Sequence, residues 1–177
     1  MKKRRSSIIV FVLVAALCLG IGYAALADDL FVTGSANISV EHAEDAFAED
    51  IYFSRAVMNA EAGTAVIGAD EHGEASDKVT ITVADGALKG KDDYVICNLE
   101  IKNAGDIDAK VTMGGMTGLN TEYFDVTTSW GATTSQNIPA GGTLDIVYTI
   151  KCIKTPTTAV STNFSVTFQA ESVDTGA

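Results

Sequence analysis

Few side chains in this 177-residue sequence have the types and spacing that catalysis or metal binding requires. The two histidines, His42 and His72, stand in acidic segments, and neither has a second metal ligand at a recognised spacing. We expect both to be solvated surface residues. No Gly-x-Ser-x-Gly sequence occurs, and neither Cys97 nor Cys152 lies near a histidine in the sequence. The sequence therefore predicts a non-catalytic protein that has no cofactor and no catalytic or metal-ligating residues.

Acidic side chains are numerous, but they lack the order of a calcium-binding loop. Such a loop places Asp or Asn at every second position ahead of a glycine. No two acids stand apart as the general acid and base of a glycoside hydrolase. We interpret the acidic pairs as solvated surface charge and leave open whether they bind calcium loosely. The pairs are Glu44-Asp45, Glu49-Asp50, Asp70-Glu71 and Asp92-Asp93.

The cysteines allow two readings. Cys97 and Cys152 both fall on the apolar side of alternating segments, so both are expected to point into the core. A disulfide between them would stabilise the fold by about 3–5 kcal/mol. Alternatively, they are two separate buried thiols that serve as small core residues. The sequence gives no distance between their Cα atoms, so both readings stay open at this stage.

The elements that must position these residues are β-strands, because apolar and polar residues alternate with a period of two. In the segment 164–170, for example, Phe164, Val166 and Phe168 alternate with hydroxyl and amide residues. Strands with one apolar and one wet face pair antiparallel and bury their apolar faces by packing sheet on sheet. The sequence thus predicts an all-β fold, a two-sheet antiparallel β-sandwich of jelly-roll or immunoglobulin-like type.

We expect about eight strands in this sandwich, separated by turns rich in Gly, Asn and Asp. The acidic segment 43–50 is expected to be a short helix or a loop, and 60–76 a connection without a strand. No repeat and no interdomain linker is evident. The expected strands are 30–40, 51–58, 79–83, 94–102, 109–113, 123–130, 144–152 and 164–170.

The first 27 residues have the layout of a secretory signal peptide. Residues 2–5 are all basic, and residues 6–27 carry no charge and are mostly apolar. Cleavage after Ala27, ahead of Asp28, places small residues at both recognition positions, whereas cleavage after Ala25 places Tyr23 at the outer one. An uncleaved signal-anchor helix is the alternative. Residues 28–177 are then one exported β-sandwich domain, which predicts a secreted or cell-surface protein.

The net charge limits the classes of partner. The chain has 12 basic and 23 acidic residues, a formal charge of −11. Removing residues 1–27 takes away four basic residues and no acidic one, which leaves 8 against 23 and a charge of −15. Nucleic acid is excluded as a partner, because binding it requires a basic face that displaces counterions from phosphate. Contact with a membrane is expected only through an uncleaved leader.

The expected N-terminal strand, residues 30–40, is unusually regular. Its even positions are small or apolar and its odd positions are mostly polar. Such a strand can lie at the edge of its own sheet, which the residues alone favour. It can also be donated to the open edge of a neighbouring molecule, a contact that repeats head to tail and makes fibres. The inward set would be Leu30, Val32, Gly34, Ala36 and Ile38.

Three stretches resemble the TasA/camelysin-type exported proteins of Gram-positive bacteria. Gly22-Tyr-Ala-Ala, followed by Thr33-Gly34, is similar to the cleavage region and first strand of that family. The strand, Asn-x-Gly turn and strand of residues 99–111 and the turn into a strand at 138–144 are similar to later parts of it.

The resemblance implies a jelly-roll-like sandwich that a dedicated signal peptidase releases, with cleavage after Ala25. It further implies a subunit of biofilm-matrix fibres that polymerises with its own copies or with related matrix proteins. The donor residues would be Leu30, Val32, Ala36 and Ile38. Two alternatives remain: a monomeric immunoglobulin-like adhesin, and an exported metalloprotease such as camelysin-like members have been considered to be.

Overall fold

The computed structural model describes residues 30–40, 50–69, 75–131 and 133–173, and it contains ten β-strands within these ranges. All ten belong to two packed sheets, so the predicted all-β sandwich is confirmed. The strands are β1 (Leu30–Val40), β2 (Ile51–Met58), β3 (Gly63–Ala69), β4 (Ala75–Val83), β5 (Tyr94–Asn103), β6 (Ala109–Met113), β7 (Phe124–Thr128), β8 (Ser135–Ile138), β9 (Thr143–Cys152) and β10 (Val160–Ser172).

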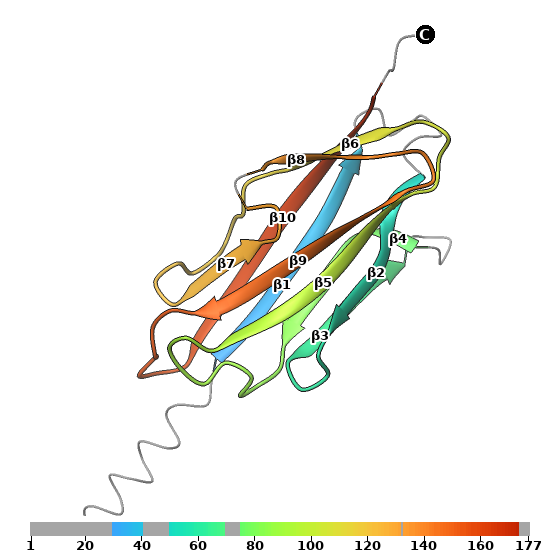
Figure 1. The fold of residues 1–177 in the computed structure, drawn as a ribbon. Coiled ribbons are helices and arrows are strands. Elements are labelled where there is room, and N and C mark those ends of the chain that lie inside the picture. Colours follow the sequence, from blue (N-terminus) through green and yellow to red (C-terminus); the bar gives the residue numbers. More distant parts are fainter. Residues whose placement is uncertain (1–29, 41–49, 70–74, 132, 174–177) are drawn as a thin grey trace, which may run out of the picture.

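One sheet has six strands and the other has four. The six-stranded sheet has the order β3-β4-β1-β10-β6-β8, and the four-stranded sheet has the order β2-β5-β9-β7. In Figure 1 the long strands β5 and β9 pass across β1 and β10, which form the middle of the sheet behind them. The apolar faces of the two sheets meet in the layer between these four strands.

Strict alternation along the strands fills this layer. In β9 the side chains of Ile146, Tyr148 and Ile150 are fully buried, while the residues between them are partly exposed. Aromatic rings from both sheets meet at Phe168 of β10. Phe53 lies edge-on to Phe168 with ring centroids 6.2 Å apart, and Trp130 does so at 5.7 Å. Such edge-to-face pairs add to the stabilisation that area burial provides.

The structure contains two strands that the sequence analysis did not predict. The first is β3, which lies within the expected connection 60–76. The strand after it, β4, was expected but begins at Ala75, four residues before the predicted start. The second unexpected strand is β8, which is only four residues long and has polar residues at its first three positions. β3 lies at one edge of the six-stranded sheet and β8 at the other. An edge strand has fewer neighbours and needs less apolar alternation, which explains why pattern alone did not reveal these two.

Some predictions fall outside the described residues. The leader with its cleavage positions Ala25, Ala27 and Asp28 lies there, as do the segment 43–49 and both histidines, His42 and His72. Within the part of the chain that the structure describes, no helix has the length and apolar character needed to cross a membrane.

Candidate functional site

β1 is an interior strand, because it lies between β4 and β10 in the six-stranded sheet. The expectation that it forms a sheet edge is therefore wrong. Both of its backbone edges are used: five consecutive residues, Thr33 to Asn37, pair with β4, and all eleven pair with β10. The alternation in β1 could not reveal this position, since it reports which face is apolar and not how many neighbours the strand has.

The pairing of β1 with β10 is parallel, whereas every other strand pair in the described part of the chain is antiparallel. The register runs without a shift from Leu30 opposite Val160 to Val40 opposite Ala170. β1 and β10 are at opposite ends of the sequence. Figure 1 shows them side by side, the blue β1 next to the red-brown β10. The N-terminal strand is therefore held by contacts that are among the longest-range in the chain.

The even-numbered residues of β1 point into the core as predicted. Leu30, Val32, Ala36 and Ile38 are exposed by only 1–3%, and Gly34 is also buried. Thr33 and Ser39, on the other face, are exposed. Ser35 and Asn37 are half-buried on that face, and the Asn37 side-chain amide donates to the Ser165 hydroxyl at 3.3 Å.

The β1 groove is the space between β4 and β10 that this apolar face fills. Its walls carry side chains that are at most 1% exposed: Val79, Ile81, Phe164, Val166 and Phe168. The sequence marked these positions as inward-facing but did not identify them as the partners of β1. The one local signal was Gly34, since a glycine inside a strand often marks a close approach by another group.

Filling the β1 groove contributes substantially to stability. Burying a Leu, Val or Ile side chain stabilises a fold by roughly 1.5–3 kcal/mol. Leu30, Val32 and Ile38 are buried to 97% or more, so together they contribute on the order of 5–9 kcal/mol before entropy is counted. This is comparable to the net stability of a whole domain. An empty β1 groove is thus strongly unfavourable, and a strand must occupy it.

The two core cysteines are separate thiols. Cys97 lies opposite Tyr148 in the pairing of β5 with β9, and both cysteines are buried and free. The backbone N–H of Cys152 instead donates to the carbonyl of Asp93, which stands four residues before Cys97 in the sequence. At a rise of about 3.3 Å per residue the two cysteines are about 13 Å apart along the sheet, too far for a disulfide. The second reading of the sequence, two buried thiols, is the one that the structure supports.

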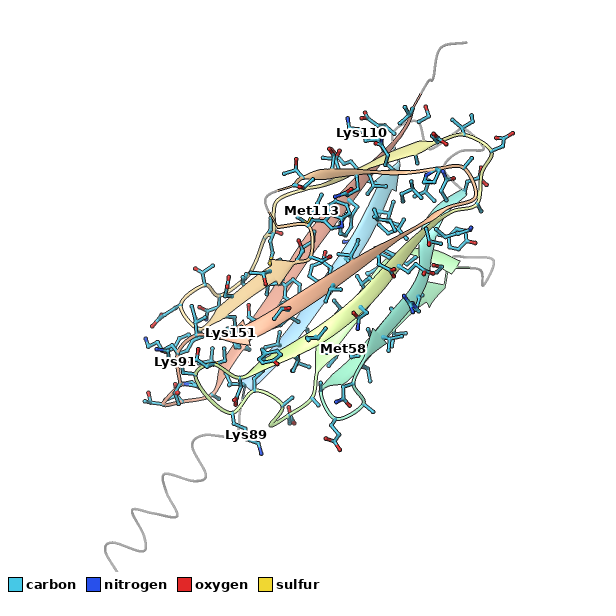
Figure 2. All side chains as sticks on the ribbon, in the orientation of Figure 1. Met58, Lys89, Lys91, Lys110, Met113 and Lys151 are labelled. Atoms are coloured by element: carbon cyan, nitrogen blue, oxygen red, sulfur yellow. The ribbon has the colours of Figure 1, made fainter. Side chains whose placement is uncertain are left out.

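The acidic pair Asp92-Asp93 lies in the loop between β4 and β5, and its carboxylates already have partners. Asp92 forms an ion pair with Lys151 at 2.7 Å, and this hydrogen bond and charge lower the pKa of Asp92. Asp93 accepts from the backbone N–H groups of Lys89 and Gly90 at 2.9 and 3.1 Å. Figure 2 shows the labelled lysines of this loop and of β9 at one end of the sandwich. These contacts give Asp92 and Asp93 a structural role, because Asp92 pairs with β9 and Asp93 holds the backbone of the loop.

A shallow hollow of about 470 Å³ lies beside this loop and is open to solvent. Polar side chains such as Asn59 and Lys89 line part of it. Across the described ranges, no group of three or more His, Cys, Asp or Glu side chains is arranged to hold a metal ion. The β1 groove, which is filled by a strand remote in sequence from both of its walls, is the feature taken as the candidate site.

No family model matches the chain, and no curated protein matches it. Among solved structures, the ASH/PapD-like domain 7 of human CEP192 is similar over 49% of this chain and 78% of that chain, with 11% identity and a TM-score of 0.27. The yeast delta-COP-I mu-homology domain is similar over 80% of this chain and 95% of that chain, with 7% identity and a TM-score of 0.19. The described part of the chain is a two-sheet β-sandwich with six strands in one sheet and four in the other, and the likenesses carry no statement about its function.

Proposed function

We propose that this protein is a secreted structural subunit that polymerises by donating β1 to the β1 groove of a neighbouring copy. The observation that carries the proposal is the placement of β1 as an interior strand that pairs with β4 and β10, which are remote from it in sequence. β1 of a second copy has the same residues and would make the same contacts. Exchange of identical elements between copies is a low-cost route to assembly.

The connection of β1 to the rest of the chain favours such an exchange. Cleavage after Ala27 or Ala25 would leave β1 only two or four residues from the new N-terminus. The strand would then be tethered on one side only, through the nine residues that separate it from Asp50. Nine residues in extended form span at most about 30 Å. That reach is sufficient to carry β1 to a molecule in direct contact.

Head-to-tail donation gives an open assembly. Each copy gives its β1 to the next copy and receives one from the copy before, so the contact is heterologous and does not close on itself. The expected product is a fibre outside the cell, in agreement with the predicted signal peptide and with the resemblance to TasA-type matrix proteins. We propose an extracellular or biofilm-matrix fibre as its location and other copies or related matrix proteins as its partners.

The test uses a disulfide that fixes β1 either within a molecule or between molecules. Ser35 of β1 lies directly opposite Thr80 of β4, both point away from the core, and opposite residues in an antiparallel pair have Cα atoms about 4.5–5.5 Å apart. That distance suits a disulfide. The variant is Ser35→Cys with Thr80→Cys in residues 28–177. Ser35→Cys alone is the matched control.

Oxidation of this variant before assembly should lock β1 in its own molecule and abolish fibres in electron micrographs. Oxidation after assembly should instead link neighbouring copies and give a ladder of covalent oligomers that collapses on reduction. Fibres that form equally well from the pre-oxidised variant would overturn strand donation. A wild-type preparation that stays monomeric would overturn the fibre function and favour the monomeric adhesin.

A further inference from the structure

We propose that Gly34 and Phe164 form a register lock, which admits a strand into the β1 groove only when a glycine faces the ring of Phe164. This inference rests on the proposed function, because it concerns which strand of a second copy the same groove accepts. The two residues lie directly opposite each other in the parallel pairing of β1 with β10. Phe164 is 1% exposed and Gly34 is buried.

The ring of Phe164 occupies the space that a side chain at position 34 would need. A Cβ atom built on Gly34 would lie 2.2 Å from Cζ, 2.4 Å from Cε1 and 2.7 Å from Cε2 of Phe164. Carbon atoms in van der Waals contact are about 3.5–4.0 Å apart. Even the smallest side chain therefore overlaps the end of the ring, and the ring is held in a packed core where it has little room to move.

The backbone gives no separate reason for a glycine at this position. Gly34 is not among the residues with positive φ, and it lies in the middle of a paired strand. A glycine inside a strand weakens that strand, because it has no side chain to pack and loses more entropy on folding. The contact with Phe164 accounts for its presence at a costly position.

Register is the property that this contact can fix. A slip of β1 by one residue would turn its polar face into the core, which the burial pattern already excludes. A slip by two residues keeps the apolar face of β1 inward, so the loss of hydrophobic burial alone disfavours it much less. It would, however, place Val32 or Ala36 against Phe164, and each of these carries the Cβ that the ring does not tolerate.

The lock also defines the partner. An incoming strand must have glycine at the central position, with apolar residues two and four positions away on both sides. Residues 30–38 of a second copy satisfy this in full, since Leu30, Val32, Ala36 and Ile38 are each buried to 97% or more when β1 lies in the groove of its own molecule. We infer that the partner at this surface is another copy of this chain, in the register seen within one molecule.

The test within one molecule uses a compensating pair. Leu lacks the Cε1, Cε2 and Cζ atoms, so Phe164→Leu removes the three atoms that an alanine at position 34 would strike. Gly34→Ala in residues 28–177 should reduce the folding equilibrium constant about ten- to hundredfold, the range typical of overpacking. Adding Phe164→Leu should recover most of that loss relative to Phe164→Leu alone. Ser35→Ala, on the outer face of β1, is the matched control and should change little.

Mixing two variant chains extends the test to assembly. A Gly34→Ala strand fits only a groove with Phe164→Leu, and the wild-type strand of the Phe164→Leu chain fits the unchanged groove of the Gly34→Ala chain. The mixture should therefore form fibres that contain both chains, whereas Gly34→Ala alone should form none. Differently labelled chains, detected in the same fibre by energy transfer, report this co-assembly.

The outcomes separate the lock from the proposed function. Equal destabilisation by Gly34→Ala with and without Phe164→Leu in the same chain would overturn the lock, whether or not wild-type fibres form. Compensation within one chain, together with wild-type chains that never assemble, would support the lock and overturn strand exchange. Wild-type fibres with no rescue in the mixture would overturn the selection of partners by this contact. Fibre formation by Gly34→Ala alone at the wild-type rate would do the same.

Discussion

The side chain of Asn103, at the end of β5, donates to the backbone carbonyl of Ile138 in β8 at 3.2 Å. β5 belongs to the four-stranded sheet and β8 to the six-stranded sheet, so this hydrogen bond joins the two layers. Asn103 is fully buried, and its amide also donates to the carbonyl of Ile107 at 2.8 Å while its oxygen accepts from the N–H of Gly105 at 3.1 Å. One amide thus satisfies backbone groups from a turn and from a strand of the opposite sheet.

Replacing Asn103 should therefore be costly although it is not one of the residues that line the β1 groove. Asn103→Ala leaves these buried backbone groups without partners, each of which costs about 1–3 kcal/mol. We expect a loss of at least about 2 kcal/mol in the free energy of unfolding, measured by urea denaturation. Asn98→Ala, at an exposed position of the same strand, is the control and should stay within about 0.5 kcal/mol of wild type. A loss no larger than that of the control would contradict the role assigned to the Asn103 amide.

The separation of Cys97 and Cys152 predicts how the thiols react. Both are buried, and burial raises the pKa of each, that of Cys97 to about 12. Because the thiolate is the reactive form, neither cysteine should be alkylated in the folded protein at pH 8, and both should be alkylated in urea without reductant. Intact mass before and after iodoacetamide measures this. Protection from alkylation in urea until a reductant is added would show a disulfide and contradict the strand register.

The raised pKa of Cys97 also predicts a loss of stability at alkaline pH. An exposed thiol in the unfolded chain ionises near pH 8.5, whereas the native thiol keeps its proton until about pH 12. Between these values the unfolded state binds fewer protons, so the free energy of unfolding falls as pH rises. Burial raises the pKa of Tyr148 as well, which extends the fall above pH 10. Urea midpoints at pH 8, 9 and 10 should decline, and less steeply in Cys97→Ala. Parallel profiles for the two proteins would contradict this assignment.

The fold was predictable wherever a residue's neighbours along the chain determine its environment. Val95, Cys97, Leu99 and Ile101 alternate with polar residues and are all buried, as their spacing predicts. β3 escaped prediction because its sequence, GTAVIGA, has small or apolar residues on both faces. In the β1 groove, the inward face of β1 followed from alternation. Its parallel pairing with β10 did not, since that pairing joins residues about 130 positions apart, and Gly34 marks a close approach without identifying the partner strand.

Gly118 and Gly131 provide a matched pair for separating backbone strain from steric overlap. Both have positive φ, 78° and 58°, where an alanine is strained by about 1–2 kcal/mol. A Cβ on Gly131 would meet open space, whereas one on Gly118 would lie 2.3 Å from the backbone oxygen of Asn163 in β10. Gly131→Ala should therefore cost about 1–2 kcal/mol and Gly118→Ala clearly more, because β10 cannot give way without disturbing β1. Thermal unfolding of both variants measures the difference, and equal shifts would contradict the close approach.

The net charge of residues 28–177 predicts that salt accelerates the proposed assembly. Residues 28–177 carry 8 basic and 23 acidic residues, so two copies that approach each other repel. This repulsion acts over about 30 Å at 0.01 M salt and about 8 Å at 0.15 M. The β1 groove binds its strand through backbone hydrogen bonds and apolar contacts, which salt does not screen. Fibre growth followed by light scattering should therefore be faster at 0.15 M than at 0.01 M sodium chloride. The urea midpoint of the monomer at both salt concentrations is the control, since a more readily unfolded monomer would also release β1 sooner. Growth that slows with salt while this midpoint is unchanged would show that ion pairs drive assembly, and it would contradict assembly through an apolar strand.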